Sequence, residues 1–437
     1  MCIISDHRPS SRSFTHPKAR ITPTFQSTIV EDRYAGISSR LPAELFRPII
    51  GYITHPPTLH AIALTCRFLL PDAQKQLYAN IPATPSFSLS DSKYSSRSSS
   101  PTFAAAAAPQ MHIAFLHTIT SYNPALALLV KFYHSPSIVS YNESPLWDLT
   151  IRGLRMMHNL KHLHFRAFGG HPAAAELLWG CKFRLETLIW GSHSDESAFG
   201  RVLQEQDALR ELYLECRDDS GSVNSIALAA CSSLTALGGN RTTVEALLPG
   251  RGVRRLAWVP DLEDDNSLPL IGMEKALGEL TTLSFGGYFS RPGLERVVYQ
   301  LRGLEVLELV GLNDVAEISL MKHIKNLREL VVSCRGGSPV FPIPLQDREL
   351  VVQNLFSDCP KLLCIDIAHS WQNVDEIKYQ RWIRGEDRPL IMMMEELSVL
   401  VVLAIRSDTN LRSKRAPFEL IVSDSKCTES LAAVNAS

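Results

Sequence analysis

Histidine side chains cluster at one place in the chain with a spacing that would allow metal chemistry. His158, His162 and His164 lie close together in the sequence. In an extended strand, the last two would point to the same face about 7 Å apart. A zinc ion needs a third and a fourth ligand, and the surrounding sequence offers neither. We therefore predict no metal site here.

Two further groups contain residue types that bind metals. Cys359, Cys364 and His369 are evenly spaced, but cysteines near strand ends are usually buried as small apolar groups. The acidic run 261–265 lacks the ligand spacing of a calcium-binding loop and is typical of a solvated loop. Neither group predicts a metal or a cofactor.

Common catalytic signatures are missing from the sequence. It contains no phosphate-binding glycine loop that ends in Gly-Lys-Ser/Thr, no His-Glu-x-x-His pattern and no Gly-x-Ser-x-Gly elbow. The C-terminal segment 385–437 has no recognisable site. The sequence thus favours a non-catalytic binding protein over an enzyme.

Composition narrows the class of partner. Of the 437 residues, 45% are hydrophobic and 20% are charged, with a net charge of -1. This balance predicts neither nucleic acid nor an anionic membrane as a partner. The apolar run 397–405 is too short to span a bilayer. Nine cysteines without a Cys-x-x-Cys pair favour a reducing compartment, so we expect a cytoplasmic and/or nuclear protein.

Five regions follow one another along the chain. We expect a disordered arm (1–37), a three-helix module (38–81), a flexible Ser/Ala-rich linker (82–110), a repeat region (111–384) and a C-terminal cap or tail (385–437). The arm is basic and serine-rich like a mitochondrial presequence, but its prolines oppose a continuous amphipathic helix. Whether the arm targets an organelle stays open.

A repeated pattern dominates the fourth region. The order apolar-x-x-apolar-x-apolar begins at Leu160, Leu185, Leu209, Leu234 (a weak copy), Val253, Leu280, Leu304, Leu327 and Leu362. Most copies begin between 19 and 27 residues after the previous one, and the last interval is longer because it contains a Gly/Pro-rich insertion, 336–344. This period is similar to that of leucine-rich repeats.

Each copy predicts one strand followed by a short helical segment. Segments with helical spacing lie at 173–179, 198–203, 223–230, 315–323 and 348–356. Ser197 is a possible N-cap, and Thr242 with Glu245 matches a capping box. Because one such unit cannot bury its apolar face alone, stacked copies form a curved α/β solenoid with a parallel sheet on the concave side. A conventional α/β sheet domain is the alternative.

The concave face is formed by the residues that alternate with the buried apolar positions. The predicted substrate-binding residues are His162, His164, Arg166, Glu211, Tyr213, Glu215, Arg255, Glu308, Glu329 and Asp366. Charge changes sign along this row from basic to acidic and back. Such a pattern favours a protein substrate, of unknown identity, over a nucleic acid, which prefers a uniformly basic stripe. An ordinary solvated face is the alternative.

Three short helices are predicted in the second region. Pro42 suits the first turn of a helix that presents Leu45, Ile49 and Ile53 on one face. Pro48 is expected to kink or restart this helix. A second helix follows Pro56-Pro57, and a third begins near Pro71. So small a core is near the limit of independent stability, so a partner is expected to stabilise it.

This second region resembles an F-box. The resemblance rests on Leu41-Pro42, Glu44-Leu45, Ile49, the apolar stretch 59–64, Cys66-Arg67 and Leu77-Tyr78. It covers about a tenth of the chain, and an F-box followed by leucine-rich repeats is a known fungal-type architecture. The family often has Trp shortly after the cysteine, where this chain has Phe68 and Leu69.

The resemblance implies a function. F-box proteins bind a Skp-type adaptor, and through it a cullin, while their repeats present a protein substrate to a Skp–cullin–F-box ubiquitin ligase whose other subunits transfer ubiquitin. The residues implied in adaptor binding are Leu41, Pro42, Leu45, Ile49, Leu64 and Leu69. The same side chains would alternatively form the core of the module. The competing hypothesis is a leucine-rich-repeat scaffold with a degenerate F-box that is not part of a ligase.

Overall fold

The computed structural model describes residues 43–82, 110–135, 145–167, 174–192, 199–216, 230–258, 272–286, 293–312, 315–333, 347–370, 378–386 and 388–393. The predicted arm, nearly all of the linker, the insertion 336–344, all but the last residue of the helical segment 223–230, Ser197 and the tail beyond Met393 lie outside these residues. The chain divides into two compact units, residues 1–76 and 77–437, and each is described by itself. The domain boundaries drawn from the sequence stay a prediction.

The first unit contains the three expected helices, α2 (Ala43–Gly51), α3 (Pro56–Thr65) and α4 (Leu70–Ala79), the last of which continues beyond the unit. Its buried side chains are Ile50, Leu59 and Ala73. Pro48 lies inside α2 without ending it, so the expected restart is wrong. Pro48 is the sixth of the nine residues of α2, so its missing N–H removes one i→i−4 hydrogen bond, and the helix continues for three more residues to Gly51.

The second unit is an α/β solenoid built on one sheet. Its described strands form a 13-stranded sheet in strict chain order, parallel from β1 to β11 and antiparallel at β12 and β13. The strands are β1 (Asn80–Ile81), β2 (Phe132–His134), β3 (His162–Ala167), β4 (Thr187–Ser192), β5 (Glu211–Cys216), β6 (Ala236–Gly239), β7 (Arg255–Trp258), β8 (Thr282–Gly286), β9 (Val306–Val310), β10 (Glu329–Ser333), β11 (Cys364–Ser370), β12 (Lys378–Ile383) and β13 (Leu390–Met393).

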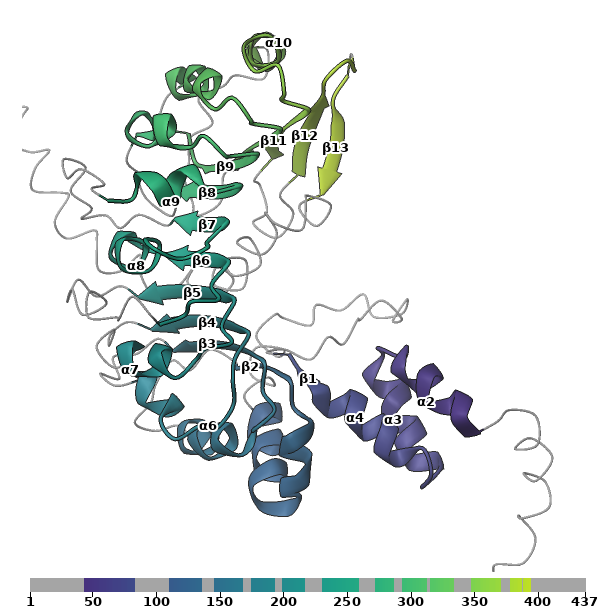
Figure 1. The fold of residues 1–437 in the computed structure, drawn as a ribbon. Coiled ribbons are helices and arrows are strands. Elements are labelled where there is room, and N and C mark those ends of the chain that lie inside the picture. The colour runs from purple at the N-terminus through teal and green to yellow at the C-terminus, as the bar shows by residue number, and fades with distance from the viewer. Residues whose placement is uncertain are drawn as a thin grey trace, which may run out of the picture. The chain divides into compact units, whose positions relative to one another are not determined.

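Short helices connect the strands on one side of the sheet (Figure 1). They are η2 (Thr118–Tyr122), η3 (Pro124–Leu129), α6 (Pro145–Met156), η4 (Ala174–Leu178), α7 (Phe199–Gln204), α8 (Arg241–Leu247), α9 (Glu274–Gly278), η6 (Leu294–Arg296), η7 (Val298–Gln300), η8 (Val315–His323) and α10 (Arg348–Asp358). Four of the five predicted helical segments are therefore present, two of them (η4 and η8) as 3₁₀ helices.

All nine sequence copies, including the weak one, become strands in matching register. Leu163 pairs with Leu188, Leu188 with Leu212, and Leu212 with Leu237, so that equivalent apolar residues stack across the sheet. Leu212 and Leu214 are buried as predicted, and these positions join a single continuous core. Alternation along each strand leaves the intervening residues on the concave face.

The weak copy has glycines at positions 238 and 239 because neighbouring side chains pack closely against the backbone there. An added Cβ at Gly238 would lie 2.3 Å from Cδ1 of Tyr213, and one at Gly239 would lie 2.7 Å from Cγ2 of Thr243. These glycines therefore leave room for neighbouring side chains. The helix that follows, α8, is capped by Asn240, whose side chain accepts a hydrogen bond of 3.0 Å from the Thr243 backbone N–H. The predicted capping box with Thr242 as the cap is wrong by two residues.

The two ends of the sheet contain strands that the repeat pattern did not predict. β1 and β2 precede the first copy, and the antiparallel pair β12 and β13 follows the last one. Trp382, the last residue that the pattern could attach to the solenoid, lies in β12. Among the described helices, none is long and apolar enough to cross a membrane.

Candidate functional site

The sheet register brings the predicted substrate-binding residues together on the concave face. His162 pairs with Thr187, which pairs with Glu211, and Arg255 and Glu329 lie at the equivalent position of later strands. His164, Tyr213, Glu308 and Asp366 lie two residues further along their strands. Arg166 and Glu215 occupy β3 and β5, but their side chains lie outside the described part of the structure.

Two of these residues form an ion pair across an intervening strand. Arg255 of β7 donates through Nη2 to Oε1 of Glu211 of β5, over Ala236 of β6. Both side chains are about one quarter exposed. Thr187 also donates a long, 3.5 Å bond to the second carboxylate oxygen of Glu211. The acidic and basic positions that alternate in the sequence therefore neutralise each other at this point.

Tyr213 lies beside this ion pair, with its ring over Gly238. Burial, and to a lesser degree the charge of Glu211, raise the pKa of the Tyr213 phenol to about 12. Together with Ala236 and Gly238, the ring closes the face over β6, where all four strand residues are buried. The centre of the concave face is thus filled by the chain's own side chains.

Three predicted contact residues face the concave side and are nevertheless buried: His164, which is 7% exposed, and two carboxylates. Glu308 is 1% exposed and accepts a 2.6 Å hydrogen bond from the Ser284 hydroxyl. Asp366, also 1% exposed, is bound by Arg381 through two hydrogen bonds of 2.7 Å. These carboxylates are held by the protein itself. Arg381 could not be assigned from the sequence, because β12 carries no copy of the repeat.

The histidines at the start of the sheet form ring contacts. His164 stacks on His134 with ring centroids 3.7 Å apart, and His162 lies 6.1 Å from the ring of Phe132. His134 and Phe132 belong to β2, which precedes the recognisable copies, so the sequence did not reveal these partners. Within the described residues, no three His, Cys, Asp or Glu side chains converge on a possible metal site.

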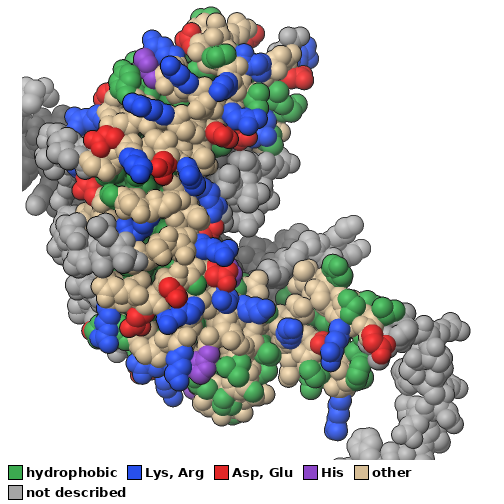
Figure 2. All heavy atoms as spheres, in the orientation of Figure 1, with side chains coloured by type: hydrophobic (Ala, Val, Ile, Leu, Met, Phe, Trp, Pro, Cys, Tyr) green, Lys and Arg blue, Asp and Glu red, His purple; other side chains and the backbone are tan. Residues whose placement is uncertain are grey.

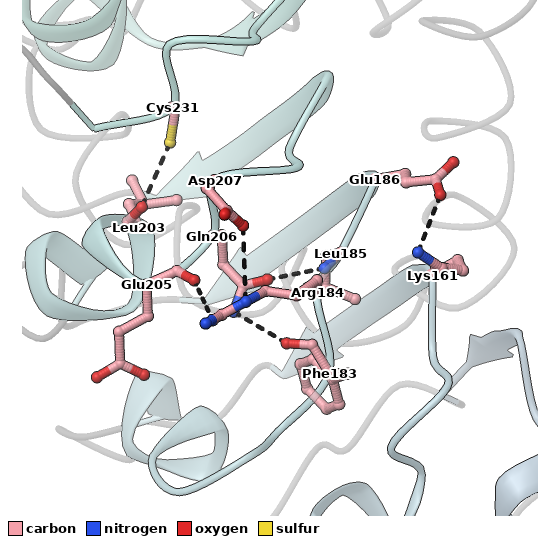
Figure 3. Close-up of polar contacts among 10 residues, drawn as sticks. All are labelled: Lys161, Phe183, Arg184, Leu185, Glu186, Leu203, Glu205, Gln206, Asp207 and Cys231. Atoms are coloured by element: carbon pink, nitrogen blue, oxygen red, sulfur yellow. Dashed lines mark hydrogen bonds and ion pairs between the residues drawn. The ribbon is translucent and has the colours of Figure 1, made fainter.

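The edge of the sheet where the strands begin carries a second polar surface. We define the strand-start row as the residues that immediately precede β2 to β10: Lys131, Lys161, Glu186, Arg210, Thr235, Arg254, Thr281, Glu305 and Arg328. From Lys161 onward, each backbone N–H in this row donates to the carbonyl of the preceding member at 2.7–2.9 Å. Lys161 and Glu186 also form an ion pair of 3.1 Å (Figure 3).

An open cleft of about 450 Å³ lies at this edge, next to Glu205 and Asp207. Arg184, which lines it, reaches the Glu205 carbonyl and lies 3.6 Å from the Asp207 carboxylate (Figure 3). Gln206 accepts a bond of 2.8 Å from the buried Leu185 N–H of the preceding repeat. Most polar groups at this cleft therefore form hydrogen bonds or ion pairs between neighbouring repeats.

Four of the described cysteine thiols are poorly suited to nucleophilic chemistry. Burial raises the pKa of Cys181, which lines the cleft, to about 12. It raises the pKa values of Cys231, Cys359 and Cys364 to about 11. Because the thiolate is the reactive form, these four groups are poor nucleophiles near neutral pH.

The helical module exposes apolar side chains rather than burying them. Leu45 is 46% exposed, Ile49 47% and Leu64 74%, and Tyr52 and Phe68 are also exposed. Figure 2 shows hydrophobic side chains on the surface of this module. Of the residues implied in adaptor binding, Leu45, Ile49 and Leu64 are therefore not core residues, and Leu69 is half-buried. Leu41 and Pro42 lie outside the described residues.

The stacked, in-register strand–helix units define a leucine-rich-repeat solenoid, a class whose extended surfaces commonly bind other proteins. No protein-family model and no curated protein matches the chain. Two similar solved structures are an internalin from Listeria monocytogenes (12% identity, TM-score 0.26, 46% of this chain) and a leucine-rich-repeat protein of Leptospira interrogans (14%, 0.27, 54%). The matched regions span only 58% and 61% of those chains.

Proposed function

We propose that this protein is the substrate-recognition subunit of a Skp–cullin–F-box ubiquitin ligase in the cytoplasm and/or nucleus. The module of α2–α4 binds a Skp-type adaptor, which connects to a cullin, and the solenoid binds a protein substrate. The protein itself catalyses no step, because ubiquitin transfer belongs to other subunits. The F-box-like sequence pattern and the exposed apolar side chains of the module support this assignment.

The exposed side chains of the module carry the proposal. Leu45 and Ile49 lie on α2 and Leu64 on α3, and each leaves about half or more of its surface in water. Leu45 and Ile49 are four residues apart and share one face of α2, and exposed apolar side chains on one face are typical of a protein-binding site. The module's own core contains only a few fully buried side chains, so a bound partner would also stabilise it.

Co-purification with a Skp-type adaptor tests the proposal. We expect the full-length wild-type chain to recover the adaptor and the Leu45→Asp/Ile49→Asp variant to lose it, because two charges would enter an apolar interface. Leu350→Asp is the matched control, since Leu350 is an exposed leucine (62%) on α10 of the solenoid. This control should retain adaptor binding.

Two results would contradict the ligase role. The wild-type chain would recover no adaptor, or the double aspartate variant would recover as much as the wild type. Either result favours the alternative, a leucine-rich-repeat scaffold with a degenerate F-box. Phe68 and Leu69, which replace the tryptophan common in the family, are the sequence feature that favours this alternative.

A further inference from the structure

Basic side chains predominate in the strand-start row. Lys131, Arg210, Arg254 and Arg328 are all exposed, and Lys161 is partly exposed. The row contains only two acids, Glu186 and Glu305, and the remaining two members are threonines. Figure 2 shows Lys and Arg side chains along this edge of the solenoid. The near-zero net charge of the chain therefore conceals a local excess of positive charge.

Most of this positive charge is available to a partner. In the part of the chain that the structure describes, Lys131, Arg210 and Arg328 have no carboxylate within ion-pair distance. Within the described contacts, the Arg254 side chain donates to the backbone carbonyl of Glu279 at 2.8 Å. Lys161 is the member already paired, with Glu186. Among the described residues, these four cations therefore form no direct ion pair with a carboxylate.

The pKa of Glu186 also indicates a positive electrostatic potential along the strand-start row. The pKa of the Glu186 carboxyl is lowered, first by its hydrogen bond from Lys161 and then by the charges of Lys161, His162 and Arg210. A carboxylate is therefore stabilised at this edge by several cations at once. A negatively charged group from another molecule would meet the same field.

The backbone ladder gives the row a fixed length and spacing. Its members lie on consecutive strands, which are about 4.8 Å apart in a sheet. Eight such steps separate Lys131 from Arg328, which corresponds to about 38 Å. An extended peptide of about 12 residues covers that distance. The row therefore has the dimensions of a binding site for a linear segment.

The two acids in the row decide between a peptide and a nucleic acid. A nucleic acid strand carries a negative charge at every nucleotide. Some of its phosphates would therefore lie close to the carboxylates of Glu186 and Glu305 and be repelled by them. A peptide can place neutral or basic residues opposite these two positions and acidic residues opposite the cations. The charge pattern therefore fits a protein segment that is acidic but not uniformly so.

We propose that the strand-start row binds an extended acidic segment of a partner protein, with carboxylates opposite Lys131, Arg210, Arg254 and Arg328. An acidic protein segment is thus the class of partner that the solenoid binds. Only the statement that this partner is a substrate of the ligase rests on the proposed function. Binding itself requires neither the adaptor nor the module.

Fluorescence anisotropy with the full-length chain tests this inference. The probe is a labelled peptide of about 12 residues that alternates Glu and Ser, and the comparison peptide alternates Lys and Ser. We expect only the acidic peptide to bind, with an affinity that falls as salt is added, because exposed charges are screened. Arg210→Glu/Arg328→Glu should weaken binding about tenfold or more.

Matched variants separate this surface from the rest of the molecule. Lys275→Glu makes the same kind of charge change on the exposed side of α9 and should leave peptide binding unchanged. The Leu45→Asp/Ile49→Asp variant should bind the peptide normally even if it loses the adaptor. The Arg210→Glu/Arg328→Glu variant should still bind the adaptor. Loss of peptide binding and loss of adaptor binding therefore test the two proposals separately.

Three outcomes would overturn the inference. The acidic peptide would not bind, or the row variant would bind it as tightly as the wild type. Alternatively, a single-stranded oligonucleotide of similar length would bind more tightly than the peptide, which would assign the row to nucleic acid instead. Circular dichroism of the variants confirms that any loss of binding reflects the charge change and not unfolding.

Discussion

The guanidinium group of Arg381 binds both carboxylate oxygens of Asp366, each at 2.7 Å, across the junction between the last parallel strand and the first antiparallel one. Asp366 is 1% exposed, while the side chain of Arg381 is 20% exposed. Because a buried carboxylate must be paired, this contact fixes β12 on β11 in a single register. The end of the sheet therefore depends on a residue outside the repeats.

Removal of this arginine should loosen the end of the solenoid. We expect Arg381→Ala to lower the free energy of unfolding by about 3 kcal/mol, because it leaves a buried, unpaired carboxylate behind. Urea denaturation followed by circular dichroism measures the change. Arg381→Ala/Asp366→Asn should be less destabilised than the single arginine variant, and equal losses in both would show that the ion pair is not the cause.

Gly238 should not tolerate a side chain. A Cβ at this position would lie 2.3 Å from the Tyr213 ring, which must then move or the strand must shift. We expect Gly238→Ala to lower the thermal midpoint, with a destabilisation of about 1–3 kcal/mol. Gly252→Ala is the control, since no atom lies within 4 Å of its added Cβ. A variant as stable as the control would mean that Tyr213 is not confined.

Stability should fall at high pH because of Tyr213. Its pKa is raised to about 12 in the folded protein, mainly by burial, from the ordinary value of 10.0. The unfolded chain therefore loses this proton first as the pH rises, and stability that is complete below pH 10.0 is lost as the pH rises toward 12. Chemical denaturation at several pH values measures the slope.

The Tyr213→Phe variant isolates this effect. Phenylalanine keeps the ring over Gly238 and removes the titrating hydroxyl. We expect a shallower loss of stability than in the wild type over the same pH range, with the remainder due to other groups such as Tyr133, whose pKa burial also raises. Identical slopes in the two proteins would refute the assignment to Tyr213.

The start of α8 provides a test of the observed cap. Asn240→Ala should destabilise the protein by about 1 kcal/mol, because the Thr243 N–H loses its only side-chain acceptor within the described hydrogen bonds. Thr242→Ala should have a much smaller effect. The midpoints of thermal unfolding distinguish the two variants, and the opposite order of effects would restore the capping box predicted from the sequence.

The sequence by itself determined the class of fold, because the apolar pattern has the period of one strand and one helix and the same leucines reappear at equivalent register positions. It also located four of the eleven connecting helices named above (η4, α7, η8 and α10) and the residues of the concave face. It placed Leu212 and Leu214 in the core, since alternation along a strand dictates which side chains turn inward.

Only the tertiary structure decided how those faces are used. The pairing of Glu211 with Arg255 and of Asp366 with Arg381 depends on which strands become neighbours, across separations that no local pattern records. The same is true of the strand-start row, where cations from distant parts of the sequence are aligned by a ladder of backbone hydrogen bonds. Local spacing fixes the repeat, but stacking brings charges from successive repeats within range of each other.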